Sequence, residues 1–154
     1  MDGTDPEQTS GAAMVAGLVS YWSQLVEAGI STTVLLDNPG PRSAPDVPTC
    51  LLAGGAVDEC AFDTADSVSA SAAPVQREAA SLVTGVDVMD LTRSMCPDEL
   101  CLPVKDGVLM FRQGTHITAT FALAMLPEIT DSLADQPLTP GARSGSTRHA
   151  SVPS

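Results

Sequence analysis

The segment "ISTTVLLDN", Ile30 to Asn38, is the clearest indication of the fold class. Its β-branched residues and the apolar run Val34–Leu36 are typical of a strand that is buried in a sheet. Asp37 follows this run directly and marks the end of the predicted strand.

A helix is predicted immediately before this strand. Asp5 and Pro6 are typical of an N-cap followed by proline at the first helical position, and Gly29 is placed to end the helix as a left-handed C-cap. Apolar residues between these limits recur at spacings of three and four, which predicts one buried stripe made of Met14, Leu18, Trp22 and Leu25.

A second helix and a second strand repeat this order. The helix is predicted from Pro74 to Gly85, with an apolar face made of Val75, Ala79, Leu82 and Val83, and the strand is "VDVMDL", Val86–Leu91. The order helix, strand, helix, strand predicts an α/β layer with parallel strands. So few parallel strands do not normally form a stable sheet alone, so the sequence looks like part of a larger α/β layer.

The remaining sequence predicts shorter elements. Prolines, glycines and serines between Pro39 and Ala73 exclude long regular elements there, apart from a helical turn near Val57–Cys60. The dipeptide Asp106-Gly107 predicts the turn of a β-hairpin.

A final helix is predicted to start at Thr118, which can cap it, and Pro127 should kink or end it. Its predicted buried stripe is Phe121, Ala122, Met125 and Leu126. We therefore expect an N-terminal lead-in over residues 1–10, one folded domain over 11–135 and, because apolar residues are almost absent there, a disordered tail over 136–154.

The composition excludes several classes of partner. The 154 residues include 7 Lys and Arg against 19 Asp and Glu, a formal net charge of −12. Phosphate backbones and anionic membrane surfaces repel such a chain, so no nucleic-acid partner is expected. No apolar run approaches the ~20 residues of a membrane span, and the acidic N-terminus is not a secretory signal, so the chain expressed alone is expected in the cytoplasm.

The four cysteines form two local pairs, Cys50 with Cys60 and Cys96 with Cys101. Neither pair has the two-residue gap usual in zinc sites, and only two histidines are present, so neither a metal nor another cofactor is expected. Two short disulfide loops are the preferred interpretation, with free thiols as the alternative. Disulfides indicate an oxidising compartment, in conflict with the missing signal.

His116 is the candidate for chemistry. It follows a predicted strand and the polar loop Gln113–Thr115, and it directly precedes the final helix. Sites in open α/β sheets lie beyond the carboxyl ends of the strands, and a histidine there can act as a general base when a carboxylate holds its second nitrogen. Without further context, an ordinary loop histidine is the alternative.

The segments "VLLDNPGP", "VPTCLL", "MDLTRSMC" and "RQGTHIT" occur in this order. As an ordered set that includes both cysteine pairs, over roughly 11–129, they resemble the C-terminal part of the SGNH domains fused to bacterial membrane acyltransferases of the acyltransferase-3 type. The resemblance implies a partial flavodoxin-like three-layer α/β sandwich with few parallel strands.

The resemblance also implies acyl transfer onto cell-surface glycans or lipids by a domain outside the membrane, a location that would explain the disulfides. It assigns His116 as the ancestral general base and Gln113 to the position of the carboxylate partner. The family's Gly-Asp-Ser nucleophile block and its Gly-x-Asn-Asp block are not found in this sequence. An amide in place of the carboxylate costs about 10⁴ in rate in such a triad.

We therefore expect a truncated acyltransferase or esterase domain that is inactive alone. Its implied partner is the missing N-terminal part of the domain or a membrane acyltransferase. The alternative is a non-enzymatic accessory or binding module that acts through an exposed sheet edge. An intact small esterase with an unrecognised serine is a third hypothesis.

Overall fold

The computed structural model describes residues 6–41 and 46–134. The elements in chain order are α1 (Pro6–Glu27), β1 (Thr32–Leu35), α2 (Val47–Leu52), β2 (Phe62–Asp63), α3 (Thr64–Ser69), α4 (Ala73–Ser81), β3 (Val86–Met89), α5 (Thr92–Met95), β4 (Leu100–Cys101), β5 (Val104–Lys105), β6 (Val108–Leu109), α6 (Ala119–Ala124) and α7 (Leu126–Ala134). The chain is mixed α/β, as predicted. The expected tail over 136–154 and residues 1–5 of the expected lead-in over 1–10 lie outside the described residues, whereas residues 6–10 belong to α1.

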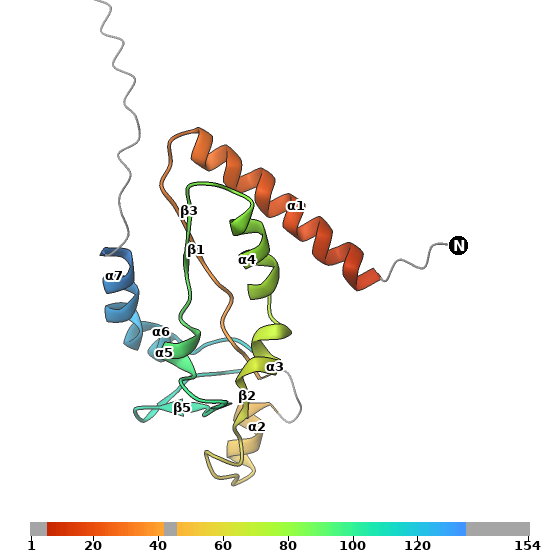
Figure 1. The fold of residues 1–154 in the computed structure, drawn as a ribbon. Coiled ribbons are helices and arrows are strands. Elements are labelled where there is room, and N and C mark those ends of the chain that lie inside the picture. Colours follow the sequence, from red (N-terminus) through yellow and green to blue (C-terminus); the bar gives the residue numbers. More distant parts are fainter. Residues whose placement is uncertain (1–5, 42–45, 135–154) are drawn as a thin grey trace, which may run out of the picture.

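Strands β1 and β3 form the predicted parallel pair, with Val34 opposite Val88. Helices α1 and α4 lie side by side against one face of this pair (Figure 1). The buried cluster on that face is made of Val15, Trp22, Val34, Leu36, Ala73, Ala79, Ala80 and Val83. The opposite face carries Leu35, which is 50% exposed, and its register partner Met89, which is 5% exposed, so the described residues cover that face only in part.

The boundaries of α1 agree with the sequence prediction, whereas α4 ends at Ser81, four residues before the predicted end at Gly85, and the buried stripes are shifted. Gly29 follows α1 with a φ of 74°, as expected of a C-terminal glycine. Gly85, with a φ of 94°, lies in the turn directly before β3 and does not cap α4, whose C-cap is Leu82. Three residues predicted to be buried are instead exposed: Met14 at 49%, Leu82 at 63% and Leu126 at 50%. Neighbouring residues on α1 and α4, among them Val15 and Ala80, take the packed positions.

A second buried cluster lies beyond the carboxyl ends of β1 and β3. It contains Val47, Phe62, Met95, Cys96, Cys101, Met110, Phe111, Phe121 and Met125. The rings of Phe62 and Phe111 meet edge to face with centroids 5.4 Å apart, which joins the long loop region to the end of the hairpin. Helices α2 and α3 and the β2–β4 pair show that the region predicted to be loop-rich holds several short elements.

The hairpin of β5 and β6 turns at Asp106 and Gly107, as predicted, with φ angles of 50° and 78°. Positive φ at both central residues is the geometry of a type I′ turn. Thr118 caps α6 by accepting a hydrogen bond from the Phe121 N–H at 3.1 Å. Helix α6 ends at Ala124 and α7 begins at Leu126, so the chain breaks the helix next to Pro127.

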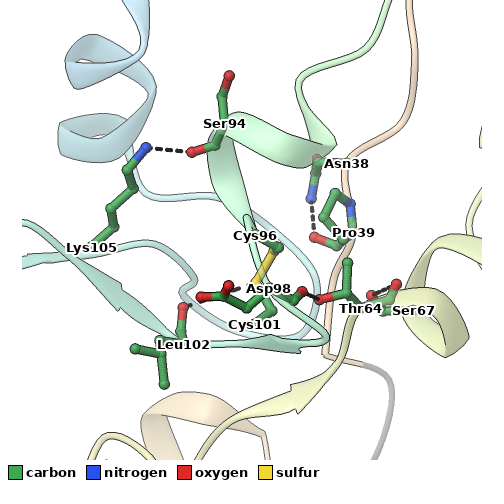
Figure 2. The surroundings of a disulfide bond; sticks show 10 residues. All are labelled: Asn38, Pro39, Thr64, Ser67, Ser94, Cys96, Asp98, Cys101, Leu102 and Lys105. Atoms are coloured by element: carbon green, nitrogen blue, oxygen red, sulfur yellow. Dashed lines mark hydrogen bonds between the residues drawn. A yellow bond between two sulfur atoms is a disulfide. The ribbon is translucent and has the colours of Figure 1, made fainter.

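Both predicted cysteine pairs are disulfides, Cys50–Cys60 and Cys96–Cys101. Figure 2 shows the second one beside the contact between Thr64 and Asp98, where the Thr64 hydroxyl donates to the Asp98 carbonyl at 2.9 Å. The loop closed by Cys96 and Cys101 is thereby attached to the start of α3. Each disulfide thus fixes a segment that has little regular structure of its own.

Candidate functional site

Asp37 follows β1 at the carboxyl edge of the parallel pair. Its Oδ2 accepts a hydrogen bond from the Ala72 N–H at 2.9 Å, just before α4. Its own N–H donates to Oε1 of Gln76 at 2.7 Å. The carboxylate therefore holds the start of α4 against the end of β1.

Asp90 follows β3 at the same edge. Its Oδ1 accepts the Thr92 N–H at 2.9 Å, and its Oδ2 pairs with the Arg77 guanidinium. Burial is the largest single influence on the pKa of Asp90 and acts to raise it, but the hydrogen bonds from Thr92 and the pairing with Arg77 together outweigh burial and lower the pKa. This carboxylate is thus ionised at neutral pH and occupied with structural contacts.

An apolar cavity of about 100 Å³ lies between this edge and α6. Its polar lining is confined to Asp37, Asn38 and Thr92. The other lining residues are Leu35, Leu36, Leu91, Met95, Ile117, Phe121, Ala122, Met125 and Ile129. The sequence alone does not predict this cavity, because its walls come from four separate segments whose mostly apolar residues have the pattern of ordinary core residues.

His116 sits on a short loop whose base is closed by backbone hydrogen bonds. Phe111 and Ile117 form a bridge at that base. The Arg112 N–H donates to the His116 carbonyl at 2.8 Å, and the His116 N–H donates to the Gln113 carbonyl at 3.5 Å. The backbone of His116 is therefore held at a defined place relative to the second buried cluster.

The side chains of Gln113 and His116 are both exposed and line one open depression together with Pro41, Gly114 and Thr115. The structure thus brings the two predicted site residues together on one surface. It does not place His116 in the apolar cavity, whose lining begins at the next residue, Ile117. Gly114 has a φ of +62°, which lets the loop turn sharply between Gln113 and Thr115.

No serine lines this depression among the residues that the structure describes, although Thr115 provides a hydroxyl there. Ser67 is the buried serine of the described chain, and its hydroxyl donates to the Thr64 carbonyl at 2.9 Å. Asp66 and Ser67 lie inside α3, not on a strand-to-helix turn that would expose a nucleophile.

The described residues also bear on metals and membranes. Within 6–41 and 46–134, no group of three or more His, Cys, Asp and Glu side chains is arranged to hold a metal ion. None of the helices described in these ranges has the length and apolar character needed to cross a membrane.

The fold and this site define the class of the protein: an α/β chain with a histidine loop placed between the last hairpin and the final helices, near the carboxyl edge of a parallel pair. Comparison with protein families gives the family itself. The model of the SGNH domain fused to AT3 domains matches residues 1–131, and the chain belongs to this family. No curated protein and no solved structure matches the chain significantly.

Proposed function

We propose that this chain supplies the imidazole-bearing part of an acyl-transfer site and works with a membrane acyltransferase on glycans or lipids of the cell surface. The observation that supports this most strongly is the position of His116. It is exposed, and it lies on a backbone-closed loop directly before α6, in a chain that the family model matches over residues 1–131.

His116 has the role of general base in this proposal. It would take the proton from a hydroxyl nucleophile and later return one to the leaving oxygen. Gln113, on the same loop, can accept a hydrogen bond from the imidazole but carries no charge that would stabilise an imidazolium. Without a carboxylate at this position, the intrinsic activity is expected to be low.

The nucleophile is proposed to come from a partner. The sequence contains no Gly-Asp-Ser block, and the depression at His116 has no serine in its described lining. Family membership, in a domain described as fused to AT3 domains, supports a membrane acyltransferase as that partner. We infer that the domain faces the outside of the cytoplasmic membrane, where its two disulfides would persist.

A fluorophosphonate probe tests this proposal, because it labels activated serines. The chain alone should give no labelling. Co-expression with an acyltransferase-3 membrane protein should give labelling and hydrolysis of p-nitrophenyl acetate, both reduced at least 10²-fold by His116→Ala. Stoichiometric labelling of the isolated chain, lost in the same variant, would show that the chain is a complete small esterase and would overturn the proposal.

In the reconstituted pair, Gln113→Asp is a gain-of-function test. A carboxylate at this position should raise kcat, since it can orient the imidazole and stabilise its charged form. Gln113→Asn is the matched control, because it has the same length as aspartate but stays neutral. Equal rates for the two variants would show that Gln113 does not occupy the partner position.

A second candidate function is a non-enzymatic accessory module. The observation that favours it is the two-stranded β1–β3 sheet, whose face opposite α1 and α4 leaves Leu35 half exposed. Such a sheet can gain strands from another chain. A monodisperse dimer with a cooperative melt and no activity with any membrane acyltransferase would favour this function.

A further inference from the structure

The apolar cavity between the carboxyl edge of the parallel pair and α6 is lined by both core and surface residues. Leu35, which is 50% exposed, and the half-buried Ala122 belong to its lining. Other lining residues are at most 5% exposed, namely Leu36, Met95, Phe121 and Met125. The cavity therefore reaches from the core to the surface, where a molecule can enter from solution.

The polar groups of the lining are mostly engaged within the chain. Oδ2 of Asp37 accepts the Ala72 N–H, and Nδ2 of Asn38 donates to the Pro39 carbonyl at 2.9 Å (Figure 2). Apolar cavities of this kind stay dry and take up apolar molecules. Among the lining residues that the structure describes, Asp37 is acidic and none is basic, so a buried carboxylate of a ligand would have no partner there. The lining therefore favours a neutral apolar ligand.

The volume of the cavity limits the length of such a ligand. A space of about 100 Å³ has room for about four aliphatic carbons, since a cavity of roughly 150 Å³ holds one benzene molecule. Met95 and Met125 have flexible side chains that can adapt to the shape of an apolar ligand. The cavity therefore fits a short aliphatic chain and is too small for a long one.

The cavity adjoins the loop that carries His116. Ile117 lines the cavity, and the residue directly before it, His116, lines the open depression. The segment after β1 also contributes to both, with Asn38 in the lining of the cavity and Pro41 in the lining of the depression. The same two segments of the chain therefore form parts of both walls.

These two segments are packed closely against each other. Pro39, Gly40 and Pro41 are buried. A Cβ added at Gly40 would lie only 2.7 Å from Cβ and 3.2 Å from Cα of Thr115, so only a glycine lets the segments approach this closely. The cavity and the His116 loop are thus held next to each other by the fold.

We propose that the cavity binds the aliphatic chain of a neutral acyl ester, with an acyl group about four carbons long. The chain is buried among the apolar residues, and the polar ester group stays at the surface, where water satisfies its hydrogen bonds. The identification of the chain as an acyl group rests on the proposed function. The preference for a short and neutral aliphatic chain rests on the cavity alone.

Binding to the full chain tests this proposal without any reaction. The probes are methyl acetate, methyl butyrate, methyl hexanoate and the butyrate ion, and the readout is the NMR signals of the methionine methyl groups, assigned with Met→Leu variants. Methyl butyrate should cause saturable shifts at Met95 and Met125, whereas the exposed Met14 on α1 should not respond. The affinity should rise about fourfold per added CH₂ from methyl acetate to methyl butyrate and then stop rising. The butyrate ion should bind at least about tenfold more weakly than its methyl ester.

A variant that fills the cavity gives a second measurement. Ala122→Leu places a larger side chain in the lining and should weaken the binding of methyl butyrate at least about tenfold. Ala124→Leu is the matched control, because Ala124 is exposed on the same helix and does not line the cavity, and it should leave the affinity unchanged. If Ala122→Leu does not fold, the series of esters on the unmodified chain decides alone.

Several results would overturn the proposal. These are the absence of saturable shifts at Met95 and Met125, equal affinity for the butyrate ion and its ester, an affinity that continues to rise with methyl hexanoate, and unchanged binding in a folded Ala122→Leu protein. The outcome is distinguishable from that of the proposed function, because fluorophosphonate labelling of the reconstituted pair can fail while the isolated chain binds the ester, and the reverse.

Discussion

At the scale of single residues, glycines decide how closely segments of this chain approach one another. Gly40 permits the contact with Thr115, and Gly55 permits a similar contact with the first disulfide, where an added Cβ would lie 2.9 Å from Sγ of Cys60. The sequence alone does not predict the role of either glycine, because a close approach between distant segments leaves no local sequence pattern. Such positions are found only when both neighbours are known.

Gly40→Ala should destabilise the protein by about 1 to 3 kcal/mol, because the added methyl group must displace the backbone of Thr115. It should also shift the NMR signals of His116. The matched control is Gly17→Ala, in the interior of α1, where nothing lies within 4 Å of an added Cβ. That variant should be stabilised by up to about 1 kcal/mol, since alanine has the higher helix propensity. Equal effects in chemical denaturation would contradict the predicted contact.

Asp90 gives a prediction about pH. Its pKa is lowered in the folded state, so it contributes stability above its unfolded pKa of ~3.9 and loses that contribution as the pH falls through the folded pKa. Asp90→Asn should therefore be less stable than the unmodified protein at pH 6 by at most about 1 kcal/mol, because the pair with Arg77 is partly exposed. The difference should disappear at pH 2. Asp87→Asn, at an exposed carboxylate on β3, the strand that Asp90 follows, controls for the general loss of charge.

At the scale of elements, the helices and strands could be predicted from local sequence patterns, whereas the faces on which they pack could be predicted only in part. The order of the main helices and strands, the Asp106-Gly107 turn and the cap at Thr118 follow from short-range chemistry and are confirmed. The predicted buried stripe of the second helix was wrong at Leu82, which is the C-cap of α4 and is exposed. A nine-residue helix with alanines on several sides offers more than one apolar face. Which face packs depends on α1, a neighbour distant in sequence.

At the candidate site, too, features within one segment could be predicted, whereas contacts between distant segments could not. The sequence predicts that Gln113 and His116 share a loop before the final helix, since both belong to one short segment, and the structure places them together. The position of the apolar cavity could not be predicted, because its walls come from segments that meet only in the folded chain. The roles of Gln113 and His116 in catalysis stay predictions.

The two disulfides should differ in how readily they are reduced in the folded protein. Cys96 and Cys101 are at most 2% exposed, whereas Cys50 is only half-buried. A thiolate must reach the sulfur it attacks, so mild reductant should open Cys50–Cys60 first. A time course of alkylation followed by peptide mass spectrometry checks this. Earlier alkylation of Cys96 and Cys101, or four free thiols before reductant is added to material secreted into an oxidising compartment, would contradict the prediction.

Removing either disulfide should lower the free energy of unfolding by about 2 to 3 kcal/mol, because each closes a short loop in the unfolded chain. Paired Cys→Ala variants, compared by urea denaturation, measure the loss for each loop. A difference in the order of reduction with similar losses of stability would show that access, and not loop size, sets the reactivity of the two bonds.

At the scale of the whole molecule, the described residues form two buried clusters and leave one face of the β1–β3 sheet partly uncovered. The first cluster lies between the helices α1 and α4 and the parallel pair, and the second lies beyond the carboxyl ends of those strands. Because exposed apolar surface on a two-stranded sheet favours association, the isolated chain should aggregate or dimerise through this face.

Leu35 and Val34 test this prediction as adjacent residues on opposite faces of β1. Leu35→Thr should reduce the association measured by light scattering. It should change the free energy of unfolding by at most about 0.5 kcal/mol, because the Leu35 side chain is half exposed and threonine also has a high β-propensity. Val34→Thr is the matched control: its site is 6% exposed and faces α1 and α4, so the buried hydroxyl should cost about 1 to 3 kcal/mol. Equal losses of stability, or association that Leu35→Thr leaves unchanged, would show that this face is not the surface through which the chain finds its partner.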